Sequence, residues 1–368
     1  MPFKPLRVTK VKIKKMQVVL IVLAFLVIGS VAVLGYFFYR NLHPIDDRYL
    51  QQTLAAGFTE QTAALDNGSV INYGEGPDNG PALLLIHGQG VSWEDYAAVL
   101  PELSKNYHVF AVDCFGHGQS SHDPALYSCS ANGQALIAFM ERVIGEKCFV
   151  SGHSSGGILA AWLGANAPEL VSGVLLEDPP LFSVTPEEMQ KGSGCFAWQD
   201  TFTTIHSFQN QTDETDFVVY YFKHGYMVSL FGGLKEPVVA AVEMFREEHP
   251  GQGPRIYWIP YSWLRLMNTF DHYDLAFGET FYDGSWMNGI HQEAMLKMIP
   301  APTIYLKAET NYGQDGVLYA ANSDEDAHKV QACLSDCETM TIKSGHDIHY
   351  EHPDFFISAV KNLENKTK

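Results

Sequence analysis

Two adjacent serines, Ser154 and Ser155, stand between glycines in the stretch GHSSGG, but only one of them has the spacing of a catalytic nucleophile. Residues 152–156 fit the pattern G-x-S-x-G, in which a tight turn between a strand and a helix exposes the central serine. The backbone of such a turn is so crowded that side chains two residues to either side would clash. Ser154 has Gly152 and Gly156 at those positions, whereas Ser155 has His153 at one of them. Ser154 is therefore the predicted nucleophile.

Two backbone amides are predicted to stabilise an oxyanion formed by attack of Ser154. The amide of Ser155 opens a predicted helix, where the N–H groups and the helix dipole favour negative charge. A second donor is expected in the loop after an earlier strand, and HGQG (residues 87–90) follows the apolar run LLLI. We predict the Gln89 amide as that donor. A glycine turn that serves only the path of the chain is the alternative.

The predicted general base is a histidine late in the chain, because the order along such sequences is Ser, acid, His. In the stretch IKSGHDIHYEHP, His346 directly follows a predicted strand, whereas His349 and His352 lie near the start of the final helix. The three histidines also suggest a metal site. However, no carboxylate or cysteine spacing completes a ligand set, so neither a metal nor a cofactor is expected.

With these motifs assembled, the chain resembles the α/β-hydrolase-fold serine hydrolases of the esterase and lipase kind. The resemblance covers about residues 74–363, apart from an insertion, and rests on HGQG, DCFGHGQSS, GHSSGG and SGHDIHYEHP. It implies an α/β fold with a mostly parallel sheet and helices on both faces. It also supports His346 as the catalytic base, since the first histidine of the last motif has that role in the family.

The acid departs from the pattern that is commonest in that family. The usual place is the loop after the strand PTIYLKA, but counting along that loop reaches Asn311, which carries no charge to stabilise an imidazolium. Other members carry the acid at the end of the preceding strand, where VLLEDPPLF offers Glu177 and Asp178. Glu177 is expected to point to the other side of the sheet, since neighbouring strand residues alternate. We predict Asp178 as the acid, with Asp315 as the alternative.

Strands and helices alternate around these motifs, which predicts a parallel sheet between helices. Asn67-Gly68 predicts a hairpin turn ahead of the first of these strands. Residues 181–299 break the alternation, and their aromatic and helical segments predict a mainly helical cap inserted after the sixth strand, over the sheet edge where ligands bind. The predicted core is then residues 59–180 and 300–368.

The N-terminal region predicts a membrane anchor. Residues 1–15 contain six lysines and arginines and no acid, and Met16–Tyr39 contains no charged residue. That stretch is close to the roughly 20 residues that span a bilayer. The positive-inside rule predicts a cytoplasmic segment 1–15, a single-pass transmembrane helix 16–39, a juxtamembrane linker 40–58 and an extracytoplasmic catalytic domain. A signal peptide cleaved near Ser30–Ala32 is the alternative, although its apolar region would exceed the usual length of about 7–15 residues.

Charge and composition narrow the function further. A net charge of −18 argues against a nucleic-acid partner, and six cysteines without a CxxC pattern leave disulfide pairing open. The expected function is a membrane-anchored serine hydrolase that cleaves a small apolar carboxylic ester through an acyl-enzyme intermediate. A peptidase, amidase or thioesterase with the same triad is an alternative. The absence of an acid at Asn311 also leaves open a non-catalytic, hydrolase-like binding protein.

Overall fold

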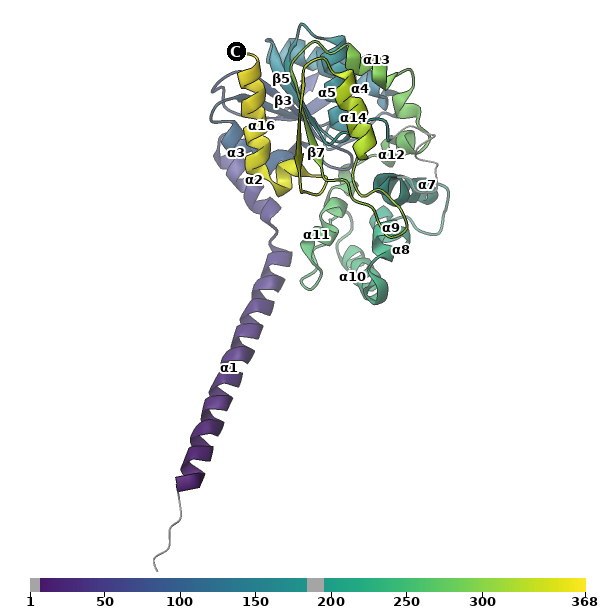
Figure 1. Cartoon of the computed structure of the whole chain (residues 1–368). Coiled ribbons are helices and arrows are strands. Elements are labelled where there is room, and N and C mark those ends of the chain that lie inside the picture. Colours follow the sequence, from purple (N-terminus) through teal and green to yellow (C-terminus); the bar gives the residue numbers. More distant parts are fainter. Residues whose placement is uncertain (1–6, 184–194) are drawn as a thin grey trace, which may run out of the picture.

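A computed structural model of the chain describes residues 7–183 and 195–368. Its centre is an eight-stranded sheet with the order β1-β2-β4-β3-β5-β6-β7-β8 (Figure 1). The pairs β1–β2 and β2–β4 are antiparallel, and the remaining pairs are parallel, which confirms the predicted mostly parallel sheet. The strands are β1 (Thr59–Ala64), β2 (Val70–Glu75), β3 (Ala82–Ile86), β4 (His108–Val112), β5 (Cys148–His153), β6 (Val171–Glu177), β7 (Thr303–Ala308) and β8 (Cys337–Ile342).

Helices cover both faces of this sheet because its central strands are apolar on both sides. In β3, Leu84 and Ile86 pack into one hydrophobic cluster, while Leu83 and Leu85 pack into the other. This division follows from the alternation of side chains along a strand. The first cluster is covered by α4 (Cys129–Phe139), α5 (Ser155–Asn166), α13 (Gln292–Lys297) and α14 (Asp324–Cys333), and the second by η1 (Trp93–Ala98), α3 (Leu100–Leu103) and α16 (Pro353–Lys366).

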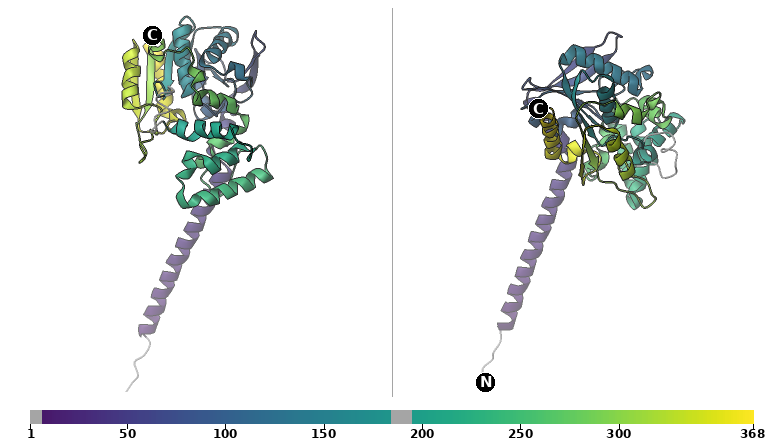
Figure 2. Two further views of the ribbon diagram at one scale, coloured as in Figure 1. Left: turned by 90° about the vertical axis from the view of Figure 1, so that its right-hand side faces the viewer. Right: turned by 45° about the horizontal axis from the view of Figure 1, so that its top comes forward.

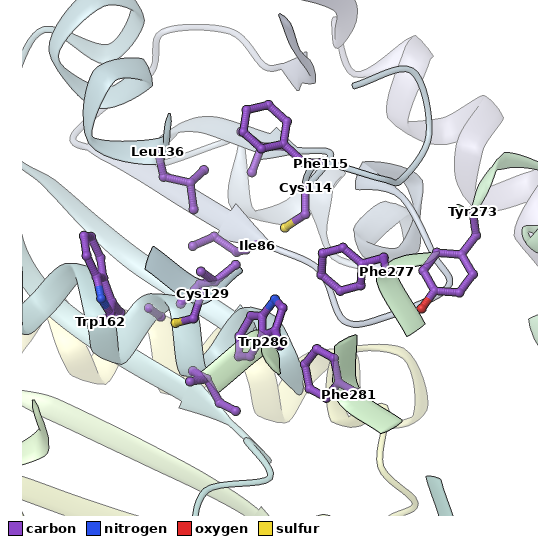
Figure 3. Close-up of a cluster of buried hydrophobic side chains, with 14 of the residues drawn as sticks. Ile86, Cys114, Phe115, Cys129, Leu136, Trp162, Tyr273, Phe277, Phe281 and Trp286 are labelled. Atoms are coloured by element: carbon purple, nitrogen blue, oxygen red, sulfur yellow. The ribbon is translucent and has the colours of Figure 1, made fainter. Parts of the chain in front are cut away.

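A mainly helical cap follows β6, as predicted. Its aromatic side chains continue the hydrophobic core, and Figure 3 shows Tyr273, Phe277, Phe281 and Trp286 of the cap in the same cluster of buried side chains as Ile86 of β3. The rings of Phe281 and Trp286 lie 4.6 Å apart between centroids. The cap therefore packs against the sheet. Before α13 its helices are η4 (Trp198–Phe202), α7 (Thr203–Gln209), α8 (Phe217–His224), α9 (Tyr226–Ser229), η5 (Gly232–Leu234), α10 (Lys235–Glu248), α11 (Tyr261–Leu264), η6 (Leu266–Asn268), η7 (Phe270–His272), α12 (Leu275–Tyr282) and η8 (Ser285–Met287).

The N-terminal helix α1 (Arg7–Leu42) projects away from the body of the molecule (Figures 1 and 2). Its segment Gln17–Leu42 is long enough and apolar enough to cross a membrane, and it is the one such segment in the part of the chain that the structure describes. The region 40–58, expected as a linker, contains a second helix, α2 (Ile45–Ala55). The buried Thr53 hydroxyl of α2 donates to the Ala97 carbonyl at 3.1 Å, so α2 is part of the folded body.

All six cysteines lie in the described residues and are free thiols. Four of them are buried: Cys114, Cys129, Cys148 and Cys195. Burial is the largest cause that raises the pKa of Cys148 to about 12. These thiols are therefore protonated near neutral pH and pack as small apolar side chains.

Candidate active site

The predicted nucleophile Ser154 lies in the turn between β5 and α5. Its φ of 54° and ψ of −121° are unusual for a residue with a side chain, and its amide donates to the Glu177 carbonyl at 2.9 Å. The glycines around Ser154 are required because any side chain at their positions would overlap neighbouring backbone atoms. A Cβ on Gly152 would overlap the backbone of Gly156, and a Cβ on Gly156 would overlap the carbonyl oxygens of Ile86 and His87. The crowding that selected Ser154 over Ser155 is therefore present in the structure.

The predicted oxyanion loop passes directly over this turn. A Cβ on Gly88 would lie 2.9 Å from Nδ1 of His153 and 3.1 Å from Cβ of Ser154. The loop can therefore lie this close to the serine turn only with glycine at position 88. The cap holds the next residue, because the Tyr273 hydroxyl donates to Oε1 of Gln89 at 2.7 Å. Ser155 opens α5, and the first amides of a helix lack intrahelical acceptors. The two predicted donor residues thus border one cavity with Ser154.

His346 and Asp178 lie in direct contact: Nδ1 of His346 is 2.7 Å from Oδ2 of Asp178. Asp178 is fully buried just after β6 with a φ of 40°, and its Oδ1 accepts from the Ala308 amide at 3.1 Å. Its own amide donates to the Leu306 carbonyl at 2.8 Å. Burial acts to lower the pKa of His346, but the hydrogen bond and charge of Asp178 raise it overall. Since Asp178 occupies Nδ1, Nε2 is the ring nitrogen left for proton transfer.

The alternative acids lie elsewhere. Asp315 is exposed and accepts a hydrogen bond from the Tyr226 hydroxyl at 2.5 Å, and Asn311 is exposed on the same loop. Glu177 points to a different histidine from its neighbour Asp178, as the alternation along β6 predicts. Its Oε1 lies 2.8 Å from Nδ1 of His349 and accepts from the His349 amide at 2.7 Å. Of the three candidates, only Asp178 contacts His346.

A buried network of charges lies beneath the His346–Asp178 pair. Nε2 of His349 is 3.1 Å from Asp95, and Arg265 of the cap contacts Asp95 at 2.6 Å and Asp347 at 2.9 Å. Although burial acts to lower it, the carboxylates of Glu177 and Asp95 raise the pKa of His349 to about 10. Burial acts to raise the pKa of Asp95, but Arg265 and His349 lower it well below its usual range. The network is thus made of charged groups, and it touches the sequence neighbours of both Asp178 and His346.

The same network reaches the helix α2 through Asp46. This carboxylate lies 3.2 Å from Nε of Arg265 and accepts hydrogen bonds from the hydroxyls of Tyr261 (3.0 Å) and Tyr350 (2.7 Å). The guanidinium of Arg265 also lies 3.8 Å from the centre of the Tyr350 ring. Sequence reasoning missed Asp46, Asp95, Arg265 and Asp347, because they lie in four separate segments. Only Asp347 stands in a quoted motif, SGHDIHYEHP, and no spacing there marks its ion pair with the cap.

His153, the residue before the predicted nucleophile, supports the loop that carries His346. Its Nε2 lies 3.2 Å from the His346 carbonyl oxygen and 3.5 Å from Asp347. Burial, followed by repulsion from His346, lowers the pKa of His153, so it is neutral near pH 7. Both neighbours of Nε2 are hydrogen-bond acceptors, so the neutral ring carries its proton on Nε2 and donates it to the His346 carbonyl oxygen.

One group of side chains has the proximity of metal ligands: ligand atoms of Asp95, His153 and His349 lie within 4.8 Å of one another. The chemistry of these groups does not suit a metal. His349, with a pKa of about 10, is protonated near neutral pH and offers no lone pair, and Asp95 is paired with Arg265. The group therefore fits a network of ion pairs better than a metal site.

A mostly apolar cavity of about 940 Å³ borders Ser154 and His346. This volume is near the upper end of the range of small-molecule sites. The cap contributes aromatic side chains to its wall, among them Phe196, Phe202, Phe270, Tyr273 and Phe281. Other aromatic side chains of the cap do not reach the cavity: Tyr221 and Trp286 are fully buried in the core.

Relatives of known sequence share parts of this chain. An uncharacterized protein of Mycobacterium tuberculosis is 35% identical over 98 residues, which cover 27% of this chain and 29% of that protein. This chain therefore matches less than a third of the length of that relative. The human serine hydrolase-like protein is 28% identical over 138 residues, which cover 36% of this chain and 66% of that protein.

Solved structures share the fold over most of its length. A bacterial membrane phospholipase A has a TM-score of 0.58 and 19% identity, covering 94% of this chain and 98% of the other. The enol-lactonase of Burkholderia xenovorans has a TM-score of 0.55 and 15% identity, covering 83% and 100%. The model of the alpha/beta hydrolase family matches residues 83–359, three quarters of the sequence. With this match, the eight-stranded sheet and the serine turn after β5, the chain belongs to the alpha/beta hydrolase family.

Proposed function

We propose that the protein is a membrane-anchored serine hydrolase that cleaves a carboxylic ester through an acyl-enzyme intermediate. The observation that carries this proposal is the 2.7 Å contact between His346 and the buried Asp178, at a cavity that also contains Ser154. A base oriented by a carboxylate, beside a serine on a tight turn, is the arrangement of a nucleophilic hydrolase.

In the proposed mechanism, Nε2 of His346 takes the proton of the Ser154 hydroxyl as Oγ attacks the ester carbonyl. The amides of Gln89 and Ser155 stabilise the oxyanion. The protonated His346 then gives its proton to the departing alkoxide, and the alcohol leaves. His346 next removes a proton from water as the water attacks the acyl-enzyme. It then gives that proton to Oγ of Ser154 as the bond from Oγ to the acyl carbon breaks, so the carboxylic acid leaves and the free enzyme is restored. Asp178 stays ionised throughout and stabilises the imidazolium.

The cavity supports an ester with an apolar part, because its wall is rich in aromatic side chains and its charged residues are mostly paired. Arg265 forms ion pairs with Asp95 and Asp347 at the cavity wall. An acyl chain in this cavity would lose its contact with water at little electrostatic cost.

Labelling with a fluorophosphonate tests the nucleophile. We expect the wild-type protein and Ser155→Ala to form an adduct, because Ser155 contributes only its backbone amide, and we expect Ser154→Ala to form none. Hydrolysis of a series of p-nitrophenyl esters, run beside the matching thioesters and anilides, identifies the bond that is cleaved. An adduct that persists in Ser154→Ala would overturn the proposal, as would faster cleavage of the anilides.

We also propose that α1 remains as an uncleaved anchor, with residues 1–15 in the cytosol and the catalytic domain outside. The basic N-terminal segment and the exposed apolar helix support this orientation. The full chain should stay with membranes after an alkaline wash, and mass spectrometry should find its N-terminal segment. Release of a shorter chain that begins near Ala32 would identify the segment as a signal peptide instead.

A further inference from the structure

The anchor helix forms part of the wall of the cavity that contains Ser154. Val33, Tyr36, Phe37, Arg40 and Asn41 of α1 line it. Their spacing of three and four residues places them on one face of the helix. The cavity thus extends from the serine turn to the apolar segment that is long enough to cross a membrane.

Specific contacts hold this end of α1 against the cap. The ring of Phe38 meets the ring of Tyr257 edge-on at 5.1 Å between centroids. The Asn41 side chain bridges two cap residues: its Nδ2 donates to the Tyr257 carbonyl at 2.7 Å, and its Oδ1 accepts from the Tyr261 amide at 3.4 Å. The wall that α1 provides is therefore anchored to the cap at a defined register.

Apolar side chains of the cap are exposed on the side from which α1 emerges. Figures 1 and 2 show α9 and α10 on that side of the body. Leu230 and Leu234, which lie between these helices, are 56% and 52% exposed, and Tyr257 beside α1 is 51% exposed. Exposed apolar side chains next to a membrane-spanning helix are suited to the interface of a bilayer.

We propose that the cavity admits its substrate sideways from the bilayer, and that this substrate is the long-chain acyl ester of a membrane lipid. The acyl chain would lie against Val33, Tyr36 and Phe37 and place its ester carbonyl at Ser154. An entrance walled by the apolar segment of the anchor joins the lipid phase to the catalytic serine without an aqueous step. This inference rests on the proposed function and names its substrate class.

The test compares two substrates with the full-length protein reconstituted in unilamellar phosphatidylcholine vesicles, with and without added diacylglycerol. Release of fatty acid reports on lipid esters, and p-nitrophenyl acetate reports on a water-soluble ester. The variant Val33→Trp puts a bulky apolar side chain in the entrance. Val31→Trp is the matched control, because Val31 lies on the opposite face of α1 and is similarly exposed (63%, against 68% for Val33).

We expect fatty acid release from at least one vesicle type, and a ratio of lipid to acetate hydrolysis that falls about tenfold or more in Val33→Trp. The ratio should stay at the wild-type level in Val31→Trp. Acetate hydrolysis without any release of fatty acid would overturn the lipid substrate and leave the hydrolase intact, as would equal ratios in both variants. If the wild-type protein hydrolysed neither the lipid nor the acetate and formed no fluorophosphonate adduct, the proposed function itself would be overturned.

A binding measurement avoids dependence on turnover. Ser154→Ala in vesicles that contain a phosphatidylcholine with a photoactivatable acyl chain should cross-link at Val33, Tyr36 or Phe37 upon illumination. Adducts should be several-fold fewer at Val31 and Ile28 on the opposite face, because only the cavity face encloses the chain. An even distribution around α1 would show that the lipid merely surrounds the helix, and would overturn the inference.

Discussion

Arg265 of the cap lies 2.9 Å from the carboxylate of Asp347, the residue that directly follows His346. The same guanidinium contacts Asp95 of the core and Asp46 of α2. One side chain thus joins the cap, the core and α2 to the loop that carries the proposed base. The geometry of the site therefore depends on elements that are far apart in the sequence.

Replacing Asp178 by Asn should lower kcat by about 10⁴-fold, because the amide cannot stabilise the imidazolium and favours the wrong tautomer of His346. Steady-state hydrolysis of a p-nitrophenyl ester measures this. Asp315→Asn is the control, since Asp315 is exposed and contacts Tyr226 instead of His346. If Asp315→Asn were the inactive variant, the assignment of the acid would be wrong.

The pH dependence of kcat/KM should show a limb that falls towards acid as His346 becomes protonated. The midpoint should lie above the ordinary histidine value of about 6.5, because Asp178 raises the pKa of His346 against the effect of burial. In Asp178→Asn the stabilising charge is gone, so the residual activity should have its midpoint at lower pH. A midpoint that moves upward, or stays unchanged, would contradict the role of Asp178.

Asp46 and Asp47 are adjacent acids of α2 with different surroundings, which makes them a matched pair. Asp46 accepts hydrogen bonds from two tyrosine hydroxyls and from Arg265. Asp46→Asn should therefore reduce the free energy of unfolding by about 1–3 kcal/mol. Asp47 pairs with Arg255 on the surface, and Asp47→Asn should cost about 0–1 kcal/mol. Urea denaturation gives both values, and equal costs would argue against a structural role for Asp46.

Arg265→Met should be more damaging than either of these variants. It leaves Asp95 and Asp347 without their cation, and loss of one partner of a buried pair costs about 3–5 kcal/mol. Because Asp347 follows His346, kcat for p-nitrophenyl acetate should fall as well. Arg265→Lys retains the charge but not the geometry of several simultaneous contacts, so it should rescue only part of the stability. Full recovery in the lysine variant would show that charge alone matters.

Stability should decline at alkaline pH because of His349. The pKa of His349 in the folded state, about 10, exceeds the ordinary histidine value. The contribution of His349 to the free energy of unfolding is therefore complete below about pH 6.5, and it is lost as the pH rises through about 10. The loss amounts to roughly 3–5 kcal/mol of the free energy of unfolding. Urea denaturation from pH 6 to 10 measures the decline, and His349→Gln should flatten it. An equal decline in that variant would assign the effect to other groups.

Gly156→Ala should abolish activity and destabilise the protein by more than about 3 kcal/mol, because the added Cβ meets backbone that has no room to move. Gly233→Ala provides the control, since a Cβ at Gly233 meets no atom within 4 Å. That variant should lie within about 0.5 kcal/mol of the wild type. Thermal unfolding followed by circular dichroism compares the two.

Much of the fold was predictable because its local signals agree with its tertiary contacts. The run ALLLI is apolar throughout and forms β3, buried on both faces. The glycines around Ser154 predicted the turn, and the structure shows the backbone contacts that require them. By contrast, β1 has the sequence TEQTAA and is largely exposed at the sheet edge, so it carries no hydrophobic pattern.

The site residues that stand in sequence motifs could be predicted. Those that only tertiary folding brings together could not. His346 follows a strand in a recognisable motif, and the alternation along β6 separated Asp178 from Glu177. The partners of Arg265 lie up to 219 residues away from it along the chain. No periodicity or spacing marks such contacts, because each pair depends on where the cap and α2 dock.

The six free thiols carry a consequence for how the protein is made and handled. Since the six cysteines form no disulfide, the cap is held to the sheet by noncovalent contacts: the packed aromatic side chains and the ion pairs of Arg265. Reducing agents should therefore leave the native state intact. Four thiols are also shielded from oxidants by burial.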